Sequence, residues 1–141
     1  MSKVGFIGIG LMGLPMCRRL LQANVDLWVF NRNGDKCAPL VTEGAKQADS
    51  LEAIVQEVDV VMMCISNTDA VMDVASQILP HITEGQIIVD FSSISPDATI
   101  QLANQVADKG ACWVDSPVSG GVAGAEAGSL AIMAGGESEA V

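Results

Sequence analysis

Short apolar runs recur along the chain, and polar or mixed segments separate them. The runs cover residues 4–7, 26–30, 58–65, 86–90, 111–115 and 130–134. Runs of this length that are apolar nearly throughout are typical of parallel strands buried on both faces of a sheet. The pattern therefore predicts a sheet whose strands are mostly parallel, with the run at 58–65 in its centre.

The segments between these runs predict helices at residues 14–21, 36–44, 70–79 and 97–108, and a further helix capped by Asp49 or Ser50. Residues 45–48 are expected to form a short extended link. Ser95 followed by Pro96 is a typical helix start, with Pro96 in the first helical position. Strands that alternate with helices predict an α/β fold, a doubly wound and mostly parallel sheet of the Rossmann type, with ligands at the carboxyl ends of its strands.

The first apolar run leads directly into a glycine-rich turn with the pattern G-x-G-x-x-G. Its first glycine permits a tight turn, the second lets the backbone approach a pyrophosphate, and the third lets the next helix pack closely. A helix N-terminus at this point binds anions without needing a lysine. We therefore expect the whole turn to bind a dinucleotide: Gly8, Ile9, Gly10, Leu11, Met12 and Gly13.

The end of the second apolar run bears on the choice of cofactor. Many NAD-binding domains place an acidic residue there for the ribose hydroxyls, but this chain has Asn31 followed by Arg32. A neutral residue does not repel a 2′-phosphate, and a guanidinium can pair with one. This pair favours NADP over NAD, although Arg32 as a solvated turn residue is the alternative.

Composition narrows the possible partners. The 141 residues carry 17 acidic and 7 basic side chains, a formal charge of −10, without a basic cluster. Nucleic acid and anionic membranes are therefore not expected as partners. Four scattered cysteines, without metal-ligand spacing, indicate reduced thiols in a cytoplasmic protein and no metal site.

Two later segments, residues 115–121 (DSPVSGG) and 128–136 (GSLAIMAGG), together with the first turn at residues 5–16, are similar to the β-hydroxyacid dehydrogenases. That family includes 3-hydroxyisobutyrate dehydrogenase and the glyoxylate/succinic semialdehyde reductases. It shares its nucleotide-binding domain type with 6-phosphogluconate dehydrogenase. The resemblance covers essentially the whole chain, and it implies that residues 1–141 form one Rossmann-type NAD(P)-binding domain.

The resemblance also implies roles for single residues. Ser119, Gly120 and Gly121 match the segment that binds the substrate carboxylate, and Ser93 matches the position beside the nicotinamide. Ile65 and Ser66 match a pair beside the nucleotide, where relatives often have Leu-Pro. The family's catalytic lysine lies in a motif that this chain does not contain. We therefore assign no catalytic residue here, and expect that lysine on an all-helical domain beyond Val141.

These observations lead to one expected function and two alternatives. The expectation is an NADP(H)-binding domain of a homo-oligomeric oxidoreductase that transfers a hydride between the nicotinamide and a small β-hydroxyacid or its semialdehyde. The first alternative is a non-catalytic nucleotide-binding module or sensor. The second is an NAD-dependent enzyme of the 3-hydroxyisobutyrate dehydrogenase type. In either enzyme, this chain alone is expected to be inactive.

Overall fold

The computed structural model describes residues 3–10, 12–65, 67–92, 94–116, 118–119 and 131–132. The strands are β1 Lys3–Ile7, β2 Asp26–Phe30, β3 Lys46–Gln47, β4 Val60–Met63, β5 Ile87–Asp90, β6 Cys112–Asp115, β7 Val118–Ser119 and β8 Ala131–Ile132. The α-helices are α1 Gly13–Gln22, α2 Ala38–Thr42, α3 Leu51–Glu57, α4 Thr68–Ile78 and α5 Pro96–Ala107, and two short 3₁₀ helices cover Gly34–Cys37 and Leu79–His81.

Six strands form one sheet in the order β3-β2-β1-β4-β5-β6, and every pair in it is parallel. The order reverses between β1 and β4, which are neighbours in the sheet although two strands separate them in the chain. This confirms the predicted doubly wound α/β fold. Folds of this kind bind their ligands beyond the carboxyl ends of the strands, at the point of reversal.

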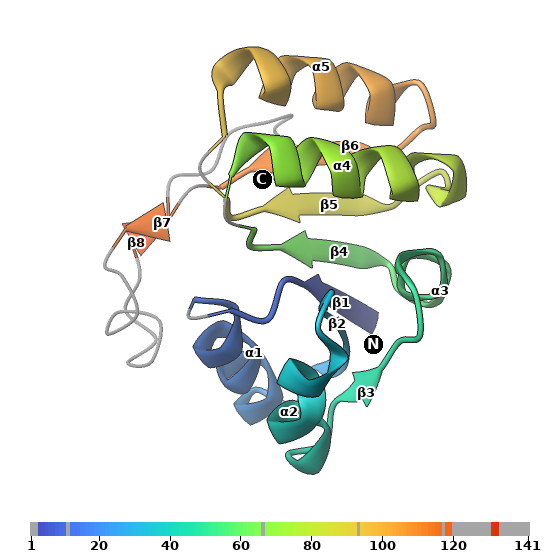
Figure 1. Ribbon diagram of the computed structural model, residues 1–141. Helices are drawn as coiled ribbons and strands as arrows, with labels where there is room; N and C mark the ends of the chain where they lie inside the picture. The colour runs from blue at the N-terminus through green and yellow to red at the C-terminus, as the bar shows by residue number, and fades with distance from the viewer. Residues whose placement is uncertain are drawn as a thin grey trace.

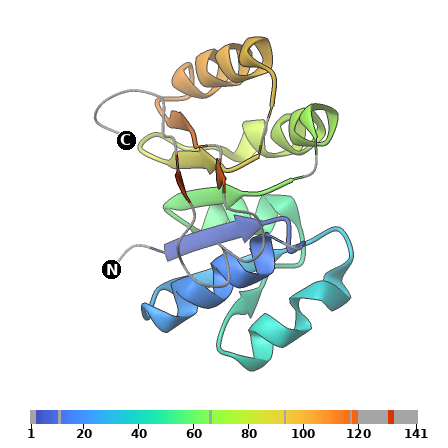
Figure 2. The same cartoon turned by 90° about the vertical axis from the view of Figure 1, so that its left-hand side faces the viewer.

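Helices cover the sheet in two groups. Both views show α1 and α2 beside β1 and β2, apart from α4 and α5, which run along β4, β5 and β6 (Figure 1, Figure 2). Successive residues of one strand belong to the two different cores: Phe6 packs with Cys17 and Leu40, whereas Ile7 packs with Ile54 and Val71. Burial on both faces explains why these strands are apolar throughout.

Three expectations differ from the structure in detail. The helix expected at residues 36–44 is a 3₁₀ turn followed by α2, which begins at Ala38 with Pro39 in its first turn. The extended link at 45–48 contains β3, an edge strand that pairs with Trp28 and Val29 of β2. The run at 130–134, expected as a strand of the main sheet, contains β8, which pairs antiparallel with β7 in a separate two-stranded sheet.

The expected helix caps are confirmed in the part of the chain that the structure describes. The Ser50 hydroxyl accepts from the Ala53 N–H at 3.0 Å, so Ser50 rather than Asp49 caps α3. Ser95 caps α5 in the same way through the Ala98 N–H. None of the described helices combines the length and the apolar character that crossing a bilayer requires.

Candidate functional site

The glycine turn begins at the end of β1 and lies between the ends of the neighbouring strands β2 and β4. Gly8 follows β1 directly, has φ +98°, and donates its N–H to the carbonyl oxygen of Phe30 at 3.0 Å. A Cβ at Gly8 would collide with the backbone carbonyl of Cys64, just beyond β4. Both the positive φ and the close approach require glycine at this position.

The other two glycines have opposite surroundings. A Cβ at Gly13, the first residue of α1, would collide with the carbonyl oxygen of Gly8. At Gly10, by contrast, no described atom lies within 4 Å of the position that a Cβ would occupy. Gly13 is therefore required for packing, whereas the Cβ position of Gly10 is open with respect to the described residues.

The N-terminus of α1 also fits an anion. Among the described residues, no side chain caps this helix end, and its first turn contains no acidic residue. Uncapped N–H groups and the positive end of the helix dipole favour a negatively charged ligand. Together with the open side of Gly10, this helix end is where we expect a pyrophosphate.

Asn31 links the glycine turn to the end of β2. Its side-chain oxygen accepts the Ile9 N–H at 2.9 Å, and its amide nitrogen donates to the Asn33 carbonyl at 3.0 Å. Both ends of the amide are therefore engaged, which also fixes its orientation. Asn31 thus positions the backbone of the turn and places a neutral group where many NAD-binding domains carry a carboxylate.

A cleft of about 590 Å³ opens beside this link, at the reversal point between β1 and β4. Its floor includes the ends of β1 and β2, and α4 forms one wall. The described lining residues are Ile7, Gly8, Phe30, Asn31, Arg32, Leu51, Ile65, Asp69, Ala70, Asp73, Val74 and Gln77. The cleft is therefore continuous with the glycine turn and has an apolar floor with charged groups at its rim.

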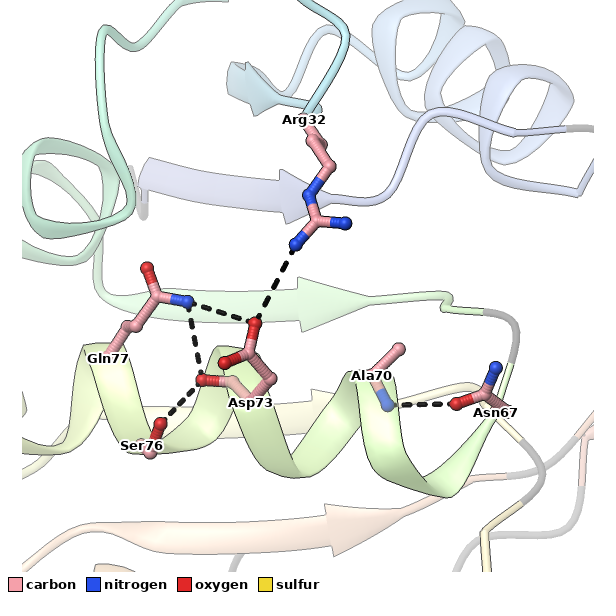
Figure 3. A network of polar contacts seen from close by, with 6 residues as sticks. All are labelled: Arg32, Asn67, Ala70, Asp73, Ser76 and Gln77. Carbon is pink, nitrogen blue, oxygen red and sulfur yellow. Dashed lines mark hydrogen bonds and ion pairs between the residues drawn. The ribbon is translucent and has the colours of Figure 1, made fainter.

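Arg32 provides a cation at this rim. Its side chain is 95% exposed and extends from the loop after β2 towards Asp73 on α4, with 3.9 Å between Nη2 and the carboxylate Oδ2 (Figure 3). A pair this exposed contributes little to stability. Arg32 is consequently able to turn towards a bound anion at small cost.

A second cluster of polar groups lies at the ends of β4 and β5. The Ile65 N–H donates to the Ser92 hydroxyl at 2.7 Å, and the Ser92 N–H donates to Asp90 Oδ1 at 2.9 Å. Asp90 is fully buried, and its other carboxylate oxygen has no hydrogen-bond partner among the described residues. Burial raises the pKa of Asp90 to about 6, although hydrogen bonds from Ser92 oppose the shift.

Asp115 lies opposite Asp90 in the register of β5 and β6. Burial also raises the pKa of Asp115, and its charge contributes to the raised pKa of Asp90. This cluster holds the loops after β4 and β5 together. It therefore positions Ile65, which lines the cleft, whereas Ser92, Asp90 and Asp115 are not among the described lining residues.

The structure brings most of the predicted cofactor residues to one edge of the sheet. Gly8, Ile9, Gly10, Met12, Gly13, Asn31, Arg32 and Ile65 all lie at or just beyond the carboxyl ends of β1, β2 and β4. Ser119 lies in β7, with its backbone paired to Ala131. Leu11, Ser66, Ser93, Gly120 and Gly121 lie outside the described residues, so their roles stay predictions.

Sequence reasoning missed the α4 wall of the cleft. Asp69, Asp73 and Gln77 line it at intervals of four residues, which places them on one face of the helix. This spacing was visible in the sequence and could have been combined with the position of α4 directly after a central strand. No set of three or more potential metal ligands occurs within the described ranges.

Fold, glycine turn and cleft together define a dinucleotide-binding domain. Residues 3–141 match the family described as the NAD binding domain of 6-phosphogluconate dehydrogenase. The chain belongs to this family, which confirms the resemblance inferred from the motifs.

Individual relatives are oxidoreductases by name. The chain is 39% identical to the 2-(hydroxymethyl)glutarate dehydrogenase of Eubacterium barkeri, over 99% of this chain and 47% of the relative. It is 34% identical to the glyoxylate/succinic semialdehyde reductase 2 of Arabidopsis thaliana, a chloroplastic protein, over 96% of this chain and 38% of the relative. Among solved structures, Psf3 in complex with NADP+ and 2-OPP has a TM-score of 0.93 at 38% identity, covering 97% of this chain and 50% of that chain. The chain thus spans about half the length of its relatives or less.

Proposed function

We propose that this chain is the NADP(H)-binding part of an oxidoreductase that acts on a small β-hydroxyacid or its semialdehyde. The observation that carries the proposal is the open side of Gly10, which faces no described atom and belongs to the same turn as Gly8, a lining residue of the cleft that ends at Arg32. A pyrophosphate against Gly10 would leave the adenosine end of the cofactor to the cleft. When bound, the nicotinamide supplies or accepts the hydride.

The preference for NADP rests on Asn31 and Arg32. Asn31 is neutral and already engaged with the turn, so it presents no negative charge to a 2′-phosphate. Arg32 is exposed and close enough to the cleft to contact one. A relative of known structure has NADP+ bound, which supports the same choice.

The remaining roles follow the family resemblance. We propose that Ser119, Gly120 and Gly121 bind the substrate carboxylate, and that Ser93 and Ser66 lie near the cofactor. Ile65 contributes a wall of the cleft. The proton is handled by a residue outside these 141 residues, so the chain's own task is to hold the two reactants in place. We further propose a cytoplasmic location and a homo-oligomeric parent protein.

Calorimetric titration of the chain with NADPH and NADH tests the cofactor assignment. We expect NADPH to bind more tightly, and Arg32→Ala to weaken NADPH about tenfold while changing NADH less than twofold, because a charge-assisted bond is lost only with the phosphate. Arg18→Ala is the matched control, since Arg18 pairs with Glu43 at 3.1 Å and does not line the cleft.

Equal affinity for the two cofactors would contradict the role of Arg32. Failure to bind either cofactor would overturn the proposed function altogether. Reduction of a semialdehyde by this chain alone, at a rate near that of a related full-length enzyme, would show that the proton-handling residue lies within it. Binding without turnover in the parent protein would instead favour a nucleotide sensor.

A further inference from the structure

Asp73 lies across the cleft from Arg32 and belongs to a different element. Arg32 extends from the loop after β2, whereas Asp73 belongs to α4 and faces it over the rim (Figure 3). Their charged atoms are 3.9 Å apart, which is an ion-pair distance but too long for a hydrogen bond. The contact is therefore loose and electrostatic.

Asp73 is held in place by α4 itself. The Gln77 side-chain amide donates to Asp73 Oδ2 at 3.2 Å, so the oxygen that faces Arg32 has a second partner one turn along the helix (Figure 3). Such pairs at positions i and i+4 stabilise one orientation of both side chains. The carboxylate would thus stay at the rim when Arg32 turns away from it.

Carboxylates outnumber the Arg32 guanidinium among the described lining residues of the cleft. The described lining of the cleft contains one guanidinium, from Arg32, and two carboxylates, from Asp69 and Asp73. A 2′-phosphate adds nearly two further negative charges, whereas a free ribose hydroxyl adds none. A phosphate that contacts Arg32 must therefore do so beside the Asp73 carboxylate.

We infer that Asp73 is a specificity-determining residue, which limits the preference for NADP over NAD by competing with the 2′-phosphate for Arg32. This inference rests on the proposed function, because it requires the adenosine end of the cofactor in this cleft. It adds a residue on α4 to a choice that the sequence pattern assigns to the end of β2 alone.

Two small ligands separate the inference from the proposed function: adenosine 2′,5′-bisphosphate carries the 2′-phosphate, and adenosine 5′-monophosphate does not. Calorimetry at low salt would measure both on the wild-type chain and on Asp73→Asn. We expect about three- to fivefold tighter binding of the bisphosphate to the variant, the range that one exposed ion pair supports, and less than twofold change for the monophosphate. The gain should shrink at high salt, because exposed charges are screened.

Asp69→Asn is the matched control, since it removes the same charge from the same helix face without touching the ion pair. An equal gain in this control would overturn the inference, because the general field would then explain the effect. The same gain on going from Arg32→Ala to Arg32→Ala/Asp73→Asn would also overturn the inference, since no competition for Arg32 remains in that pair. Unchanged bisphosphate affinity in Asp73→Asn refutes the inference alone, whereas a wild-type chain that binds neither ligand refutes the proposed function as well.

Discussion

Replacing Gly10 with alanine separates the binding role of the turn from its structural role. A Cβ at Gly10 has no described atom within 4 Å, and Gly10 is not among the glycines with positive φ. The substitution also reduces the freedom of the unfolded chain. We therefore expect the free energy of unfolding to change by less than about 1 kcal/mol.

Cofactor binding should respond quite differently. The added methyl group occupies the side of the turn from which we expect the pyrophosphate to approach, so at least one charge-assisted hydrogen bond to the backbone would be lost. Such a bond is worth about 1.5–3 kcal/mol, which corresponds to roughly 10- to 150-fold weaker binding. Calorimetry with NADPH measures the affinity, and urea denaturation measures the stability of the same preparation.

Gly13→Ala provides the contrasting variant. Its Cβ would collide with the backbone oxygen of Gly8, so the turn or α1 must move, at a cost of about 1–3 kcal/mol. Gly10→Ala should thus lose binding and keep stability, while Gly13→Ala loses stability first. NADPH binding to Gly10→Ala with wild-type affinity would refute the placement of the pyrophosphate against this turn.

Three further substitutions test other parts of the site. Asn31→Ala leaves the Ile9 N–H without its partner, and we expect urea denaturation to show a loss of about 1–3 kcal/mol; an unchanged midpoint would contradict the importance of this link. Ser50→Ala removes the cap of α3 and should cost about 1 kcal/mol in the same assay, whereas Ser50→Asp should retain most of it. Asp90→Asn tests the buried carboxyl, whose folded-state pKa of about 6 exceeds its unfolded value of about 3.9, so the folded state binds the proton more tightly. Wild-type stability should therefore fall by up to about 3 kcal/mol relative to the variant as the pH rises from 4 to 7, and parallel pH profiles would disprove the buried-charge explanation.

The main strands and their topology were predictable because their burial leaves a local signature. The run at residues 26–30 coincides with β2, since both faces of that strand are covered and nearly every position is apolar. By contrast, Lys46 and Gln47 form β3 although both are exposed, because pairing with β2 rather than burial creates this edge strand. Two polar residues carry no pattern that predicts such pairing.

The candidate site likewise combines features that a local sequence pattern predicts with contacts that it does not. Gly8 and Gly13 were identifiable because each meets a local requirement of φ or close approach, and Gly10 because it completes the spaced pattern. The hydrogen bond between Ile9 and Asn31 joins residues 22 positions apart, and the ion pair between Arg32 and Asp73 joins two separate elements. Contacts of this kind depend on the folded arrangement of the sheet, so a one-dimensional pattern does not contain them.

The Asn31 amide has a consequence for attempts to redesign the cofactor preference. Exchanging it for aspartate, the obvious route towards NAD, would retain an acceptor for Ile9 but lose the donor that serves the Asn33 carbonyl. The new carboxylate would then face that carbonyl oxygen and be repelled by it, which would change the orientation of the acceptor for Ile9. One side chain, Asn31, thus affects both the recognition of the adenosine end and the shape of the phosphate turn. A substitution that changes the cofactor preference at Asn31 would also change how the turn fits the pyrophosphate.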